Sequence, residues 1–214
     1  MNGHERRARL ARSRLYFVVE ARPGGREPTA LLDAALRGGV DVVQLRDKEL
    51  GDEELVAAAE PFRRVCAGHG ALFVLNDRPD LVAACGADGV HVGQGDAPLA
   101  EARSLVGPDR LVGVSTHARE QMLAAAAGGA DYIGVGTIFS TPTKPGNAEA
   151  GLGLVRVAAE SASVPWFAIG GIDLGNVAEV AAAGARGAAV VRAIRDADDP
   201  EAAARMLRAS LEHG

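Results

Sequence analysis

Four segments of this chain repeat one pattern: a glycine that ends a helix, a small residue, a polar residue and then a buried apolar run. The four segments are residues 39–43, 86–90, 129–133 and 184–188. Such recurrence is typical of a supersecondary unit that is used several times in one fold. We therefore expect a chain built from β/α units, with the pattern marking each joint between a helix and the next strand.

Apolar runs alternate with helix signals along the whole chain, and they extend this pattern to eight units. We expect strands at residues 15–19, 40–46, 71–75, 89–92, 111–114, 132–135, 166–169 and 188–191. We expect helices at residues 28–38, 52–68, 98–106, 118–127, 154–160, 176–183 and 200–211, and a short one from residue 79. Eight even units predict an α/β protein with a single (β/α)8 TIM barrel. The alternative is an open doubly wound sheet, which the absence of a glycine fingerprint after the first strand disfavours.

Composition narrows the class of protein. Of 214 residues 48% are hydrophobic, which suits one well-cored domain, and the net charge of −5 argues against nucleic acid or an anionic membrane as the main partner. We expect residues 1–13 to be a flexible basic N-terminal arm and residues 14–214 to be the barrel domain. Cys66 and Cys85 lack metal-ligand spacing, which favours small core residues in a cytoplasmic protein. A homo-oligomer is compatible with the sequence.

The end of the second strand carries the first candidate site. Strand alternation places Gln44, Arg46 and Lys48 on one side, and a guanidinium fork beside a mobile ammonium group suits a diphosphate. A solvated strand end is the alternative for this segment alone. In a barrel, however, the loops that follow the strands share one face, so polar residues at later strand ends should be neighbours of these three.

Two acidic residues at later strand ends suggest a metal. Asp77 and Asp96 follow the third and fourth strands, and Mg²⁺ commonly takes one or two carboxylates together with phosphate oxygens and water. Each residue alone also fits a turn. As a pair on adjacent strand ends they favour a magnesium site.

The remaining strand ends offer hydroxyls, backbone amides and one further cation. Residues 141–146 form a long loop that is either functional or a plain lid. Gly170-Gly171 and Val191-Arg192 lie where barrels commonly bind a phosphate, although two glycines also fit a tight turn. We expect His91 to be a barrel-interior residue, and His117 to be either an acid/base at the rim or the start of a helix.

Six motifs taken together resemble the thiamine-phosphate synthase family. They are residues 44–48, 76–77, 87–96, 113–117, 141–144 and 169–172. The resemblance implies a Mg²⁺-dependent transferase of thiamine biosynthesis. It would join hydroxymethylpyrimidine diphosphate to hydroxyethylthiazole phosphate and release diphosphate by a dissociative, carbocation-like displacement. No protein nucleophile is needed for that reaction, which agrees with the absence of a Ser/His/Asp or Cys/His arrangement.

The resemblance also implies a role for each motif residue. The residues expected to hold the pyrimidine diphosphate are Gln44, Arg46, Lys48, Asn76 and Lys144. Asp77 and Asp96 are expected to hold Mg²⁺, and Ser115 to contact the reacting groups. Those expected at the thiazole phosphate are Thr141, Thr143, Gly171 and the amides of Val191 and Arg192. Ser115, Lys144 and Arg46 are the expected catalytic residues.

Two alternatives to the synthase remain. A thiazole tautomerase paralogue would share the barrel and the phosphate site and use His117 as its acid/base, but that group characteristically lacks the full diphosphate and metal set. A non-catalytic sensor of phosphorylated ligands would also be compatible with the charged rim. Binding of the thiazole phosphate without turnover would distinguish the sensor from the synthase.

Overall fold

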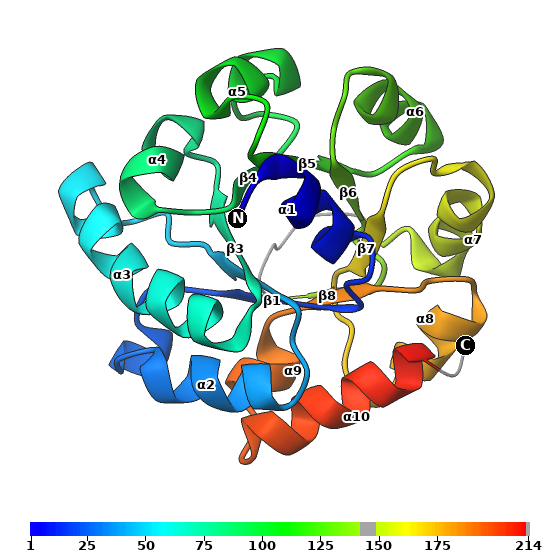
Figure 1. Cartoon of the computed structure of the whole chain (residues 1–214). Coiled ribbons are helices and arrows are strands. Elements are labelled where there is room, and N and C mark those ends of the chain that lie inside the picture. Colours follow the sequence, from blue (N-terminus) through cyan, green and yellow to red (C-terminus); the bar gives the residue numbers. More distant parts are fainter. Residues whose placement is uncertain (142–148, 213–214) are drawn as a thin grey trace.

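The structure, a computed structural model, describes residues 1–141 and 149–212 of the chain. Eight parallel strands close into a barrel in sequence order, with β8 paired to β1, and helices surround it (Figure 1). The strands are β1 Leu15–Val19, β2 Val42–Leu45, β3 Leu72–Asn76, β4 Gly89–Val92, β5 Leu111–Thr116, β6 Tyr132–Val135, β7 Trp166–Ile169 and β8 Ala188–Val190. The predicted single-domain TIM barrel is confirmed.

Within the described ranges the barrel is surrounded by more helices than the eight expected. They are α1 Gly3–Leu10, α2 Thr29–Arg37, α3 Asp52–His69, α4 Val82–Cys85, α5 Leu99–Val106, α6 Arg119–Ala127, α7 Gly151–Ser161, α8 Val177–Ala182, α9 Arg192–Arg195 and α10 Pro200–Glu212. Short 3₁₀ turns lie at Pro23–Gly25 and Pro79–Leu81. The sequence did not lead us to expect α1 or α9. None of these helices has the length and apolarity that crossing a membrane requires.

Strand alternation divides the apolar side chains into two clusters. Phe17 and Val43 point outward and pack under the helices, whereas Tyr16, Val42 and Leu72 point into the barrel. The interior cluster fills the barrel from its N-terminal end. The C-terminal ends of the strands, where the interior residues become polar, are therefore left as the open end that can bind a ligand.

The polar residue of the repeated segments anchors the start of the preceding strand. The carboxylate of Asp41 accepts a hydrogen bond from Leu15 N at 3.1 Å, that of Asp88 from Phe73 N at 3.1 Å and that of Asp131 from Val112 N at 2.8 Å. Each carboxylate also pairs with at least one arginine. In the fourth segment Arg186 stands at this position, so the repeat marks three equivalent joints and one divergent joint.

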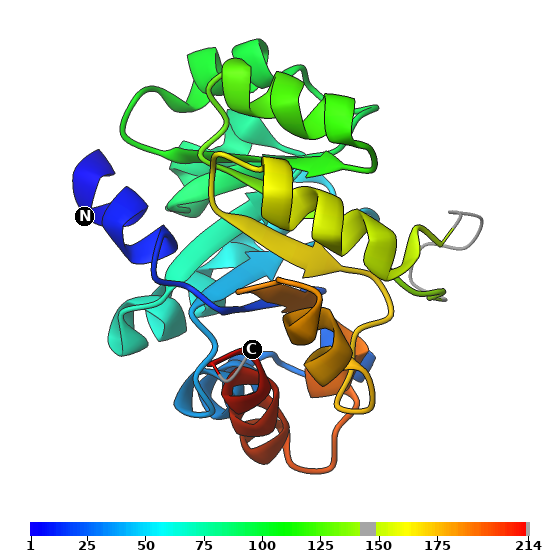
Figure 2. The same ribbon diagram turned by 90° about the vertical axis from the view of Figure 1, so that its right-hand side faces the viewer.

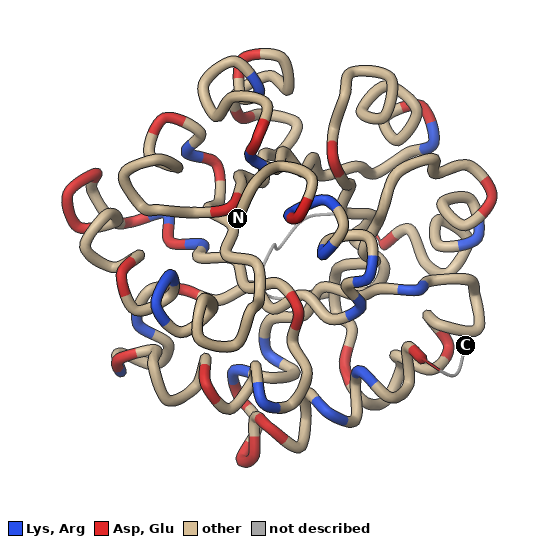
Figure 3. The backbone as a smooth tube through the Cα atoms, viewed as in Figure 1, with Lys and Arg blue, Asp and Glu red and all other residues tan. Residues whose placement is uncertain are grey.

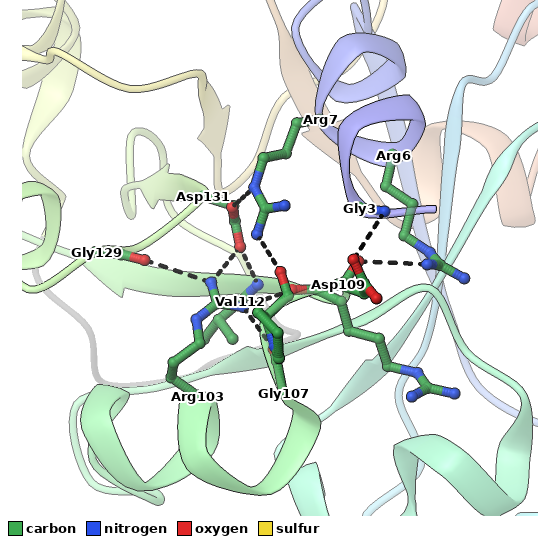
Figure 4. Close-up of polar contacts among 11 residues, drawn as sticks. Gly3, Arg6, Arg7, Arg103, Gly107, Asp109, Val112, Gly129 and Asp131 are labelled. Atoms are coloured by element: carbon green, nitrogen blue, oxygen red, sulfur yellow. Dashed lines mark hydrogen bonds and ion pairs between the residues drawn. The ribbon is translucent and has the colours of Figure 1, made fainter. Parts of the chain in front are cut away.

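The N-terminal residues form a helix that covers the N-terminal end of the barrel (Figure 2). Asn2 and Glu5 make a capping box, with Asn2 Oδ1 accepting from Glu5 N at 2.9 Å and Glu5 Oε2 accepting from Asn2 N at 2.9 Å. Instead of the expected arm, α1 is held by its arginines. Arg6 Nε lies 2.8 Å from Asp88. Arg7 Nε lies 2.7 Å from Asp131 (Figure 4). The basic segment is therefore structural, because the barrel supplies its acidic partners.

We expect Leu10→Ala to loosen α1 from the barrel. The Leu10 side chain is 2% exposed and joins the interior cluster, so its removal should lower the free energy of unfolding by about 2 kcal/mol. Urea denaturation measures this. Leu105→Ala is the matched control, since Leu105 on α5 is 53% exposed and should change stability little. Equal effects of the two substitutions would show that α1 contributes no packing.

Candidate active site

A cavity of about 370 Å³ opens at the C-terminal ends of the strands. Every predicted site residue that the structure describes lines this cavity. These residues are Gln44, Arg46, Lys48, Asn76, Asp77, Asp96, Ser115, Thr141, Gly171, Val191 and Arg192. Thr143 and Lys144 lie outside the described residues. The barrel thus brings together side chains that are up to about 150 residues apart in the sequence.

The cationic wall of the cavity follows from the alternation of β2. Gln44, 4% exposed, points into the barrel, and Arg46 and Lys48 continue on the same side at the rim. Lys48 Nζ lies 3.0 Å from Asp77 Oδ2. The guanidinium of Arg46 makes no ion pair with any residue in ranges 1–141 and 149–212. An anionic ligand at this wall of the cavity would therefore meet the guanidinium of Arg46 and the ammonium group of Lys48.

The two aspartates face each other on neighbouring strand ends. Asp77 adopts φ +62°, a left-handed conformation uncommon for residues other than glycine, and its N–H donates to His91 O at 2.8 Å. Asp96 Oδ2 accepts from Gly93 N at 2.8 Å. Burial raises the pKa of Asp77 and the adjacent Asp96 carboxyl raises it further, while Lys48 opposes both. This crowding of negative charge is what a divalent cation would relieve.

Two carboxylates are enough protein ligands for Mg²⁺, which does not need a site built wholly from protein side chains. Within the described part of the chain, no group of three or more His, Cys, Asp or Glu side chains is arranged to hold a metal. Mg²⁺ commonly keeps several waters and takes only one or two carboxylates, the rest coming from substrate phosphate. Asp77 and Asp96 therefore fit Mg²⁺ bound together with a phosphorylated ligand.

A glycine wall closes the opposite side of the cavity. Gly170 and Gly171 have φ values of +110° and +61°. A Cβ at Gly170 would lie 2.6 Å from Thr137 Cγ2, and one at Gly171 would lie 2.7 Å from Ser140 O. Only glycine fits there, and the chain next to the cavity presents backbone rather than side chain. The cavity reaches Val191 and Arg192, at the start of α9.

The structure places both histidines for which the sequence raised an expectation, His91 and His117. His91 is a barrel-interior residue, as predicted, with Nε2 2.9 Å from Ser115 Oγ and Nδ1 3.2 Å from Tyr132 Oη. His117 lines the cavity just before α6; its ring contacts Gly136 O and its N–H donates to Gln121 Oε1 at 2.7 Å. The imidazole of His117 is therefore engaged by the backbone at the rim.

Sequence reasoning missed two residues at the floor of the cavity, Tyr16 and Tyr132. Both lie in apolar runs that read simply as strands, and both point inward to line the cavity. Strand alternation was the available signal, because Tyr16 shares the inward parity of β1. Cys66 and Cys85, by contrast, are free and buried, and burial raises the pKa of both thiols, as expected of core residues.

Fold and cavity together define a TIM-barrel protein with a charged cavity at the C-terminal ends of its strands. The family model for thiamine monophosphate synthase matches residues 15–194. The chain belongs to this family, which confirms the family and the thiamine-phosphate synthase function predicted from the sequence.

Individual proteins agree with this assignment. The thiamine-phosphate synthase of Mycolicibacterium paratuberculosis is 54% identical over 203 residues, which cover 89% of this chain and 90% of the relative. A thiamine-phosphate synthase of a Nostoc species is 49% identical over 98% of this chain, which spans 59% of that relative's length. The solved thiamine phosphate pyrophosphorylase from Pyrococcus furiosus superposes with a TM-score of 0.85 at 33% identity, covering 97% of this chain and 98% of the other.

Proposed function

We propose that this chain condenses hydroxymethylpyrimidine diphosphate with hydroxyethylthiazole phosphate in a Mg²⁺-dependent reaction. The C–O bond between the pyrimidine methylene and the diphosphate breaks, and diphosphate leaves with the electron pair. The thiazole nitrogen then forms the new C–N bond to the cationic methylene, which gives thiamine phosphate. The observation that carries the proposal is the cavity that joins Arg46 and Lys48 to the Asp77–Asp96 pair.

In this proposal the residues of the β2 end hold the leaving group. Arg46 and Lys48 neutralise the charge that develops on diphosphate, and Asn76 and Gln44 orient the pyrimidine diphosphate. Lys144, from the sequence motif, would add a third cation. Bound Mg²⁺, held by Asp77 and Asp96, would supply further neutralisation of the diphosphate oxygens. Ser115, on the cavity wall, would contact the reacting groups.

The glycine wall serves the second substrate. The amides around Gly171, Val191 and Arg192 would bind the thiazole phosphate, with Thr141 and Thr143 beside the thiazole ring. Catalysis then consists of positioning and electrostatic stabilisation. Support for this comes from the cavity itself, whose described lining contains no cysteine and no Ser/His/Asp triad.

The proposal is tested by incubating purified protein with both substrates, with and without Mg²⁺. We expect thiamine phosphate and diphosphate in equal amounts, and only with the metal. Binding of thiazole phosphate without any product would favour the sensor. Isomerisation of a thiazole phosphate with no use of the pyrimidine diphosphate would favour the tautomerase paralogue.

Mg²⁺ should stabilise the protein more at high pH than at low pH. A carboxyl whose pKa is raised on folding stabilises the fold below its unfolded pKa, and this contribution is lost as pH rises through the folded pKa. Mg²⁺ would bind Asp77 and Asp96 in their ionised forms, and its binding would offset the stability that is lost at high pH. The increase in Tm with saturating Mg²⁺ should be larger at about pH 8 than at about pH 4, because at low pH protons compete with the metal for carboxyls whose pKa is raised. Equal increases would contradict a site at Asp77, and KCl at matched ionic strength is the control.

A further inference from the structure

A chain of side-chain hydrogen bonds crosses the barrel beneath the charged rim. Gln44 Nε2 donates to Tyr16 Oη at 2.8 Å, and the hydroxyls of Tyr16 and Tyr132 are 2.9 Å apart. Tyr132 Oη lies 3.2 Å from His91 Nδ1, and His91 Nε2 lies 2.9 Å from Ser115 Oγ. All five residues line the cavity, and they come from five different strands.

The two tyrosines impose one direction on this chain. Both rings are at most 2% exposed, and burial raises the pKa of each hydroxyl, so both stay protonated. A protonated hydroxyl has one hydrogen to donate. With Gln44 as donor, Tyr16 donates to Tyr132 and Tyr132 donates to His91 Nδ1. His91 then carries its proton on Nε2 and donates to Ser115.

The direction determines what the chain presents to a ligand at each end. At one end the hydrogen of Ser115 is left to point toward the cavity. At the other end, Oε1 of Gln44 makes no hydrogen bond to any residue of the described polypeptide, 1–141 and 149–212. It faces the cavity as an acceptor. Reversing all the bonds would exchange donor and acceptor at both ends. The ends are therefore coupled and have opposite hydrogen-bonding character.

We propose that Tyr16 and Tyr132 are positioning residues that couple Gln44 to Ser115 and thereby set an acceptor at one end of the pyrimidine site and a donor at the other. This inference rests on the proposed function, because an aminopyrimidine carries both complementary groups, an amino donor and a ring nitrogen acceptor. The hydroxyls act through Gln44, His91 and Ser115 rather than on the reacting atoms.

Packing holds the tyrosine rings without help from their hydroxyls. Tyr16 meets Phe167 edge to face, with ring centroids 5.2 Å apart, and Tyr132 meets Phe167 at 6.0 Å. A Cβ at Gly113 would lie 2.1 Å from Tyr132 Cζ, so the absence of a side chain at Gly113 makes room for that ring. A Tyr→Phe substitution at either position should therefore break the chain of hydrogen bonds, while the aromatic ring still fills the barrel interior.

The first test reads the tautomer of His91 by ¹⁵N NMR in the absence of any substrate. We expect the proton on Nε2 in the unmodified protein. Gln44→Glu, at a pH where the ¹³C shift shows the new carboxyl ionised, can only accept, so the chain reverses and the proton moves to Nδ1 of His91. Adding Tyr16→Phe should return it to Nε2. An unchanged tautomer in Gln44→Glu, or a switch that persists after Tyr16→Phe, would overturn the coupling.

The second test separates positioning from a general loss of structure. Tyr16→Phe should raise KM for the pyrimidine diphosphate about ten-fold, which is the effect of about one lost hydrogen bond, and leave KM for the thiazole phosphate unchanged. Thr116→Val is the control, because it removes another buried hydroxyl, which bonds Gly134 O at 2.9 Å outside the chain. Equal changes in both KM values, or none, would refute the positioning role. If the unmodified protein makes no thiamine phosphate, the proposed function fails, while the tautomer measurement still tests the chain.

Discussion

Asp77→Asn should reduce thiamine phosphate formation about a hundred- to a thousand-fold while leaving the fold intact. The substitution removes one of the two carboxylates proposed to hold Mg²⁺, so the charge on departing diphosphate is neutralised less. Stability should be retained, because asparagine tolerates the left-handed φ of +62° and no longer opposes Asp96. Steady-state kinetics at saturating substrate, together with thermal unfolding, measure both effects.

Asp80→Asn provides the matched control for that experiment. Asp80 lies three residues further along the chain and pairs with Arg78 at 2.6 Å, and it is not among the residues that line the cavity. Its replacement should leave turnover unchanged. Retained activity in Asp77→Asn, or an equal loss in both variants, would remove the basis for a metal site at the ends of β3 and β4.

The largest effect on stability is expected from Asp131→Ala, at the opposite end of the barrel. The Asp131 side chain is only 7% exposed, contacts both Arg7 and Arg103, and accepts the N–H of Val112 at 2.8 Å (Figure 4). Its removal takes away the carboxylate partner of Arg103, whose guanidinium keeps backbone carbonyl acceptors, and leaves the N–H of Val112 without its acceptor. The free energy of unfolding should fall by about 3 kcal/mol, measured by urea denaturation.

Two further variants define the cause of that loss. Asp131→Asn keeps an acceptor for Val112 N but removes the charge, so its stability should lie between those of the alanine variant and the unmodified protein. Asp33→Ala removes an exposed aspartate that pairs with Arg37 and His69, and it should have little effect because surface ion pairs contribute little. Acidic and basic residues are interspersed in this way over the outer helices (Figure 3). A loss as large at Asp33 as at Asp131 would show that burial is not the cause.

The architecture and the rim of the site could be predicted from local sequence. The repeated glycine–small–polar segments and the apolar runs report period and spacing, which depend on neighbouring residues only. Because parallel strands in a barrel end at one face, Arg46, Asp77 and Ser115 could be grouped before their distances were known. The polar residue of each repeated segment could also be recognised in the sequence, but the arginines and strand N–H groups that it contacts could not.

The sequence by itself determined the eight β/α units and the chemistry of the strand ends, because helix stops, strand parity and turn residues act over a few positions. Only the tertiary structure decided that α1 docks, since Arg6 and Arg7 find Asp88 and Asp131, 82 and 124 residues away. The same holds for the link between Tyr16 and Tyr132, 116 residues apart within apolar runs. Closure of the barrel makes such groups neighbours, and no local periodicity records which side chain will lie opposite another.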